Sequence, residues 1–163
     1  MNGKIFTLRN LYQSGTEKLE KEGIREAKLD AWYLLEYKTG ISRAVFLADP
    51  DREVEEEKAE SYQKDICTRA RRIPLQHITG EQEFMGLNFK VNENVLVPRQ
   101  DTEILVEEAL KRIRPDMQIL DMCTGSGCIL ESILKFGEKK QMHLKGTGCD
   151  ISEEAFWEQM QDL

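Results

Sequence analysis

Two acidic residues and a glycine loop are the part of this sequence best suited to chemistry. Residues 118–129 read Gln-Ile-Leu-Asp-Met-Cys-Thr-Gly-Ser-Gly-Cys-Ile, and Asp150 ends the next candidate strand. The glycines, Gly125 and Gly127, let the backbone turn sharply and let a ligand approach it closely. A carboxylate after the second strand suits ribose hydroxyls, because it can accept hydrogen bonds from both at once. The pattern predicts a nucleotide-type pocket at the carboxyl ends of two strands.

The residues after the loop narrow the class of ligand. A dinucleotide fingerprint, G-x-G-x-x-G/A, needs a small third residue for close helix packing, and this chain has Leu130 there. A phosphate-binding P-loop needs a Lys-Ser/Thr pair after the last glycine, and none is present. NAD and ATP are therefore disfavoured. A ligand without phosphates remains, and so does a strand-to-helix turn that binds nothing.

Three elements must position these residues. The apolar run Ile119, Leu120 and Met122 predicts a parallel strand covered on both faces. A helix is expected from about Gly127 to Phe136, and a second strand over residues 145–150. Two glycines make that second strand intrinsically weak. A last helix is expected from Ser152 as its cap to the end of the chain.

The first 74 residues are predicted to form a helical bundle, since apolar residues recur at helical spacing. A first helix includes Leu8 to Leu19 and stops at Gly23, and a second is closed by Gly40. A short third helix follows from Ser42 to Ala48. The fourth is expected over residues 53–72, with its buried side made of Ala59, Tyr62, Ile66 and Ile73.

A β-hairpin linker is expected between the halves, over residues 75–100. From Leu87 apolar and polar residues alternate, as in a half-exposed strand, and Gly86 indicates a tight turn before it. A helix capped near Asp101 or Thr102 should follow. Its expected apolar residues are Leu105, Val106, Ala109, Leu110 and Ile113.

Composition excludes several classes of protein. The 163 residues are 40% hydrophobic and 33% charged, without an apolar run near the ~20 residues of a membrane span or a secretory leader. A cytoplasmic location is expected. The net charge of −7 argues against a protein held to nucleic acid by general electrostatics.

Four cysteines lack the spacing of a zinc site or a C-x-x-C redox pair. In the cytoplasm they are expected to be reduced thiols that fill small spaces, without a redox or metal role. They are Cys67, Cys123, Cys128 and Cys149.

The glycine loop resembles motif I of the class I, S-adenosylmethionine-dependent methyltransferases, D/E-x-G-x-G-x-G. Asp121, Gly125 and Gly127 match it, and Cys123 stands where the first glycine would be. The linker is similar to that of the release-factor glutamine methyltransferases. Their R-x-x-P-x-x-Y-I-x-G segment corresponds to residues 71–80, with His77 for the tyrosine. Their E-F-x-G-L and P-R-x-D/E-T-E segments are Glu-Phe-Met-Gly-Leu at 83–87 and Pro-Arg-Gln-Asp-Thr-Glu at 98–103.

The resemblance implies methyl transfer from S-adenosylmethionine to the side-chain amide of the glutamine in the Gly-Gly-Gln motif of peptide-chain release factors. It implies that Asp121 faces the methionyl ammonium and that Asp150 faces the ribose hydroxyls. The full implied set of cofactor residues is Asp121, Cys123, Thr124, Gly125, Ser126, Gly127 and Asp150. For either acid the alternative is a carboxylate that only caps loop amides.

The family's N-P-P-Y motif, which accepts hydrogens from the amide, is absent, and no two of the four prolines are adjacent. Two parallel strands would also leave both sheet edges unpaired. A C-terminally truncated methyltransferase is therefore expected, with no catalytic residue of its own assigned. The alternatives are a non-catalytic protein-binding module and another class I methyltransferase acting on DNA or protein.

The expected architecture is α + α/β. A helical substrate-recognition domain at 1–74 precedes the hairpin linker at 75–100. An incomplete Rossmann-like class I methyltransferase domain occupies 101–163. The expected partners are release factors, with no direct nucleic acid and no membrane, and the chain is expected to be a monomer.

Overall fold

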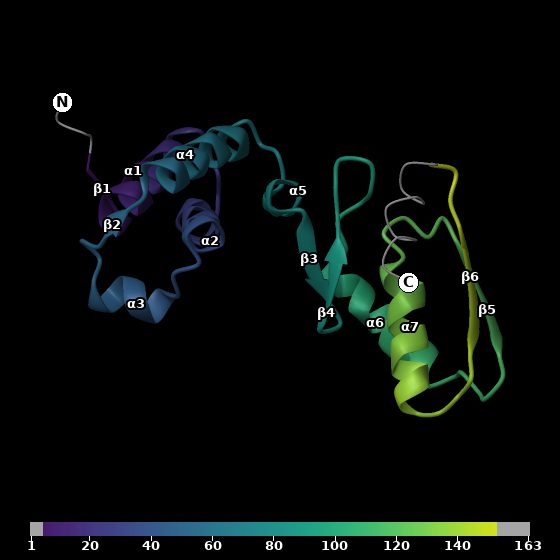
Figure 1. Ribbon diagram of the computed structural model, residues 1–163. Coiled ribbons are helices and arrows are strands. Elements are labelled where there is room, and N and C mark those ends of the chain that lie inside the picture. Colours follow the sequence, from purple (N-terminus) through teal and green to yellow (C-terminus); the bar gives the residue numbers. More distant parts are fainter. Residues whose placement is uncertain (1–4, 153–163) are drawn as a thin grey trace. The chain divides into compact units, whose positions relative to one another are not determined.

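The protein is described by a computed structural model over residues 5–152. The chain divides into two compact units, Met1–Thr79 and Gly80–Leu163. Figure 1 shows that helices dominate the first unit, while strands and helices alternate in the second. The expected mixture of helix and strand is confirmed. The helix expected after Ser152 lies outside the described residues.

Five helices make up most of unit 1: α1 (Leu8–Lys21), α2 (Ala27–Thr39), α3 (Arg43–Ala48), α4 (Glu56–Ala70) and α5 (Leu75–Thr79). Thr7 caps α1 by accepting a hydrogen bond from the Asn10 N–H at 3.3 Å. Gly40 ends α2 in the left-handed conformation, with φ 69°, as its position in the sequence predicts.

A short pair of strands before α1 and α4 was not predicted. Strand β1 (Phe6–Thr7) pairs antiparallel with β2 (Glu53–Val54). The prediction that the fourth helix starts at residue 53 is therefore wrong, because those residues extend to pair with β1 and α4 begins at Glu56. Residues 75–79, expected within the hairpin linker, form α5, which follows Pro74.

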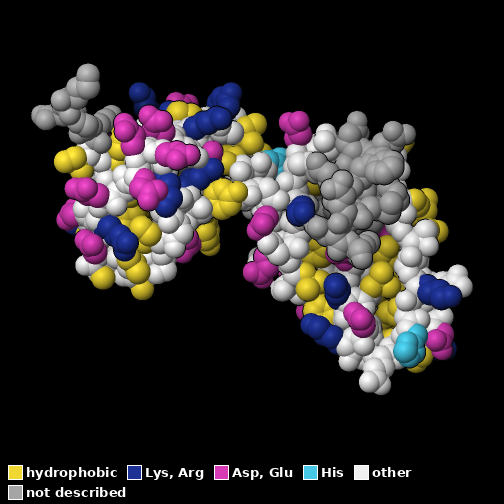
Figure 2. Space-filling model, in the orientation of Figure 1, with side chains coloured by type: hydrophobic (Ala, Val, Ile, Leu, Met, Phe, Trp, Pro, Cys, Tyr) yellow, Lys and Arg dark blue, Asp and Glu magenta, His cyan; other side chains and the backbone are white. Residues whose placement is uncertain are grey.

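The core of unit 1 lies among α1, α2 and α4. Ala59, Tyr62 and Ile66 are buried on α4 as predicted, but Ile73 is 39% exposed because the helix has already ended. The other large, fully buried side chains of this core are those of Leu8, Leu11, Leu19, Leu34 and Leu35. Acidic and basic side chains are interspersed over the face of unit 1 shown in Figure 2.

Unit 2 begins with the predicted hairpin, in which β3 (Glu81–Phe84) pairs antiparallel with β4 (Leu87–Lys90). Its two turn residues, Met85 and Gly86, both have positive φ, 54° and 70°. Two positive φ values are typical of the type I′ turn that matches strand twist.

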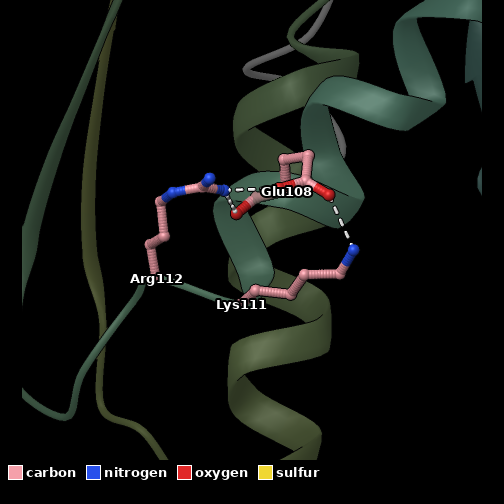
Figure 3. A network of polar contacts seen from close by, with 3 residues as sticks. All are labelled: Glu108, Lys111 and Arg112. Atoms are coloured by element: carbon pink, nitrogen blue, oxygen red, sulfur yellow. Dashed lines mark hydrogen bonds and ion pairs between the residues drawn. The ribbon is translucent and has the colours of Figure 1, made fainter.

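Helix α6 (Gln100–Leu110) follows, with Arg99 rather than Asp101 or Thr102 at its N-cap position. Val106 is fully buried, while Leu105 is 55% exposed. At the C-terminal end Glu108 pairs with Lys111 and Arg112, each at 2.6 Å (Figure 3). Hydrogen bonds from Lys111 and then Arg112 lower the pKa of Glu108 to about 2.

Strands β5 (Gln118–Met122) and β6 (Lys145–Cys149) form a parallel pair, joined by helix α7 (Cys128–Lys139). Helix α7 contacts both strands and lies along one face of the pair (Figure 1). Leu120 and Met122 are 62% and 66% exposed. The prediction of a strand buried on both faces is therefore wrong within residues 5–152, since no described element covers the second face.

Candidate functional site

The loop between β5 and α7 turns through three left-handed residues. Cys123, Gly125 and Gly127 have φ values of 62°, 52° and 69°. Glycine adopts this conformation without a Cβ penalty, whereas a cysteine there is uncommon. The glycines are therefore where the backbone geometry requires them, and residue 123 adopts a glycine-like conformation despite its side chain.

Two hydrogen bonds join the loop to the carboxyl end of β6. The N–H of Gly125 donates to Asp150 Oδ2 at 2.7 Å, and the N–H of Thr124 donates to the Cys149 carbonyl at 3.0 Å. The acid that follows the second strand thus lies against the glycine loop that follows the first. This is the juxtaposition expected where parallel strands end at the same edge of a sheet.

Asp121 lies near the carboxyl end of β5, just before the loop. Its Oδ2 accepts a hydrogen bond from the Thr124 hydroxyl at 2.8 Å. Within the described residues no protein group donates to Oδ1, so one oxygen of this carboxylate is open to another group. The alternative for Asp121 is a carboxylate that only caps loop amides, but the group that donates to Oδ2 is a hydroxyl.

Both oxygens of Asp150 accept backbone N–H groups. Oδ1 accepts from Ser152 at 3.0 Å, and Oδ2 accepts from Gly125. These bonds, with Ser152 first, favour the ionised form and lower the pKa of Asp150. Each carboxylate oxygen has a second lone pair, so the group can still accept from a ligand hydroxyl.

The glycines of β6 are required by close packing. A Cβ on Gly148 would come within 3.1 Å of Thr124 Oγ1, and one on Gly146 within 2.7 Å of the Leu134 side chain. The sequence suggested a weak strand at these positions. The structure shows that small residues are needed there, because α7 and the loop lie directly against β6.

The remaining loop residues differ in exposure. Cys123 is exposed, whereas Ser126 is 3% and Cys128 is 7% exposed. Burial is the main cause that raises the pKa of the Cys128 thiol. The structure therefore gathers all seven predicted residues at one place, but the Ser126 side chain is withdrawn from the surface that a ligand would reach.

The space beside the loop fits a ligand that approaches bare backbone. A Cβ built on Gly125 would meet no atom of residues 5–152 within 4 Å, so these residues leave room on that side of the loop. The open oxygen of Asp121 supplies an acceptor for a cation. S-adenosylmethionine, the cofactor that the resemblance implies, carries an ammonium and vicinal hydroxyls, and these donors would suit the acceptor oxygens of Asp121 and Asp150.

Glu103 was not singled out from the sequence as a positioning residue. Its Oε1 accepts the Met85 N–H at 2.8 Å, which ties the turn of the β3–β4 hairpin to α6. The E-F-M-G-L and P-R-Q-D-T-E segments are therefore in direct contact. An acidic residue in the first turn of a helix is the only sequence signal of this role.

Two features are absent from the part of the chain that the structure describes. No helix there combines the length and apolar character that crossing a bilayer requires. Nor do three or more His, Cys, Asp or Glu side chains gather there as a metal site would require.

Comparison with known proteins connects this geometry to a family. A family profile described as the PrmC N-terminal domain matches residues 10–80. A protein of Geobacter sulfurreducens named release factor glutamine methyltransferase is 37% identical over 132 residues, which is 81% of this chain and 46% of that protein. Proteins of the same name from Clostridium botulinum and Caulobacter vibrioides are 41% and 36% identical, over 75% and 92% of this chain.

These matches confirm the resemblance to the release factor glutamine methyltransferase family. The chain spans about half the length of the curated relatives that it matches: 46% of the Geobacter protein, 44% of the Clostridium protein and 51% of the Caulobacter protein. The aligned stretches are longer than the PrmC N-terminal domain, so the relationship to release factor glutamine methyltransferases extends beyond the helices of unit 1.

Proposed function

We propose that this chain provides the cofactor-binding part of an S-adenosylmethionine-dependent release factor glutamine methyltransferase. The observation that carries the proposal is the hydrogen bond from Gly125 to Asp150, which brings the glycine loop and the second acid together. On this proposal β5, α7 and β6 are the opening elements of a Rossmann-like class I methyltransferase domain, which occupies residues 101–163.

The proposed roles follow the contacts around the loop. Asp121 would hold the methionyl ammonium, directly or through water, with the oxygen that Thr124 leaves open. Asp150 would accept from the ribose hydroxyls, and the backbone of Cys123 to Gly127 would line the approach. Bound S-adenosylmethionine supplies an activated methyl group. The chain's own residues would orient the cofactor. The Ser126 side chain is buried and would help to hold the loop in place.

The proposed substrate is the side-chain amide of the glutamine in the Gly-Gly-Gln motif of a peptide-chain release factor, as the relatives' names and the resemblance suggest. An amide nitrogen is a poor nucleophile, so catalysis requires acceptors that hold it in line with the methyl group. The N-P-P-Y motif that serves this purpose in the family is absent from residues 1–163. We therefore assign cofactor binding to this chain and no catalytic residue.

Residues 1–74 are proposed to recognise the substrate, with residues 75–100 as the linker. On α2 three exposed side chains, Leu29, Tyr33 and Tyr37, follow one another at intervals of four residues and are 41%, 47% and 51% exposed. Aromatic side chains at such a surface are typical of protein contacts. A release factor is the proposed partner of this surface, bound by a monomeric chain.

A chimera tests the enzymatic proposal. Residues 1–152 of this chain would replace the matching part of the Geobacter relative, and methylation of a purified release factor would be followed by mass spectrometry. We expect glutamine methylation by the chimera and its loss in an Asp150→Ala chimera that still folds. A folded chimera that binds the release factor without methylating it would instead favour the alternative, a non-catalytic binding module.

A further inference from the structure

Lys18 and Cys67 form a close contact between two helices of unit 1. Lys18 lies in the last turn of α1, Cys67 lies on α4, and Lys18 Nζ donates to Cys67 Sγ at 2.7 Å. Charge-assisted N–H···O bonds are about 2.7–2.9 Å long. Because sulfur is larger than oxygen, the same distance between nitrogen and sulfur is a short contact. The amine and the sulfur are therefore at a reactive distance without any movement of the backbone.

The sulfur is accessible. Cys67 is exposed, contrary to the expectation that the cysteines fill small spaces. A cavity of about 230 Å³ opens beside it, and its lining residues are Ser14, Gly15, Lys18, Tyr62, Gln63, Ile66 and Cys67. A small oxidant can therefore reach the sulfur from the cavity, while the Lys18 amine lies on the same wall.

We propose that Lys18 and Cys67 form an oxidative crosslink in the presence of a hydroperoxide. In the first step the Cys67 thiolate attacks a peroxide oxygen and the O–O bond breaks. The sulfur becomes a sulfenic acid, and the peroxide is reduced to water or an alcohol. In the second step the Lys18 amine, after losing a proton to water, attacks the sulfur. The S–O bond breaks, water leaves, and an S–N bond joins the residues.

The other thiols lack this arrangement. Cys123 is also exposed, but no lysine contacts it within the described residues. Cys128 is buried, and Cys149 donates to Met122 Sδ at 3.1 Å. Lys18 is therefore the group that makes Cys67 different from Cys123.

The crosslink would tether α1 to α4 across 49 residues of chain. Closing a loop of that length restricts the unfolded chain and stabilises the fold, as a disulfide does. The inference concerns unit 1 alone and does not depend on cofactor binding. Treatment with peroxide would therefore raise the stability of the helical unit.

The experiment treats the full chain with hydrogen peroxide and maps its peptides by mass spectrometry, with Tm recorded before and after. We expect a linked peptide pair containing residues 18 and 67 that has lost two hydrogen atoms and is released by a thiol reductant. We also expect a rise of several degrees in Tm. The linked pair should disappear in Lys18→Met and in Cys67→Ser.

Lys21→Met is the matched control, because Lys21 lies in the same last turn of α1. It should retain the linked pair. If Cys67 is oxidised no faster than Cys123 and only to sulfinic or sulfonic acid, the proposal is overturned. It is also overturned if Lys18→Met forms the crosslinked species as readily as the unchanged chain.

Discussion

The N–H of Gly125 donates a 2.7 Å hydrogen bond to the carboxylate of Asp150, which lies 25 residues further along the chain. One bond thus joins the loop after β5 to the end of β6. A Cβ built on Gly125 would meet no atom of the described residues within 4 Å, so the same loop is held in place and has room beside it. Cofactor binding by this chain would depend on that combination.

Replacing Gly125 with alanine should separate backbone strain from ligand binding. At φ 52° an alanine costs about 1–2 kcal/mol, and its methyl group would enter the open space beside the loop. Gly86→Ala is the matched control, because Gly86 has φ 70° and also has nothing near its Cβ. We expect both variants to lose similar stability in urea unfolding, and only Gly125→Ala to lose S-adenosylmethionine affinity, by at least about tenfold. Equal affinities in the two variants would contradict the proposed site.

The lowered pKa of Asp150 has a consequence for acid stability. A carboxyl group whose folded pKa is depressed contributes stability above its unfolded pKa, about 3.9, and this contribution is lost as pH falls through the folded value. Asp150→Asn should therefore be less stable than the unchanged chain near neutral pH, and the difference should shrink below about pH 4. Urea unfolding at several pH values measures this, with the exposed Asp116→Asn as control. A difference that is constant with pH would contradict it.

Gly15 should not tolerate an alanine, even though alanine favours helix. The added Cβ would meet the Tyr62 hydroxyl, would lie 2.9 Å from Tyr62 Cζ, and would lie 3.1 Å from Ile66 Cδ1. Tyr62 is fully buried and cannot swing away. Overpacking costs about 1–3 kcal/mol, while the helix gains about 0.5–1 kcal/mol. We expect a net loss of about 1–2 kcal/mol by chemical denaturation, with Ser14→Ala nearly neutral. An equally stable Gly15→Ala would mean that α1 and α4 are further apart.

The ion pair between Asp30 on α2 and Arg69 on α4 should contribute more to stability than the exposed pair between Arg9 and Asp51. Arg69 Nε lies 2.7 Å from Asp30 Oδ2, and the two side chains are 19% and 10% exposed. Asp30→Asn would leave a largely buried guanidinium without its charged partner, at a cost of about 2–3 kcal/mol. Asp51→Asn breaks the exposed pair with Arg9 and should change little, since exposed pairs contribute weakly. Similar losses in the two variants would contradict this assignment.

Local signals in the sequence predicted much of the fold. Gly40 ends α2, and Gly86 marks the hairpin turn, because each position requires a left-handed residue. Helical spacing identified Tyr62 and Ile66 as core residues. In these cases the signal lies within a few residues of the feature that it predicts.

Features that depend on distant partners were missed. The two-residue strands β1 and β2 contain too few residues for a periodic pattern, and their pairing joins positions far apart in the chain. Leu120 and Met122 read as buried because they are apolar, yet burial depends on a covering element and α7 covers only the other face. The contact of Lys18 with Cys67 likewise arises only when α1 packs against α4.

The most direct measurement is calorimetric titration of S-adenosylmethionine into the purified chain, with circular dichroism to establish that it is folded. We expect saturable binding with a dissociation constant in the micromolar range, weakened at least about tenfold by Asp150→Ala and unchanged by Glu138→Ala on the exposed side of α7. A folded chain that binds no S-adenosylmethionine, or that binds it equally well without Asp150, would contradict the proposal that the Gly125 loop and Asp150 form the cofactor site.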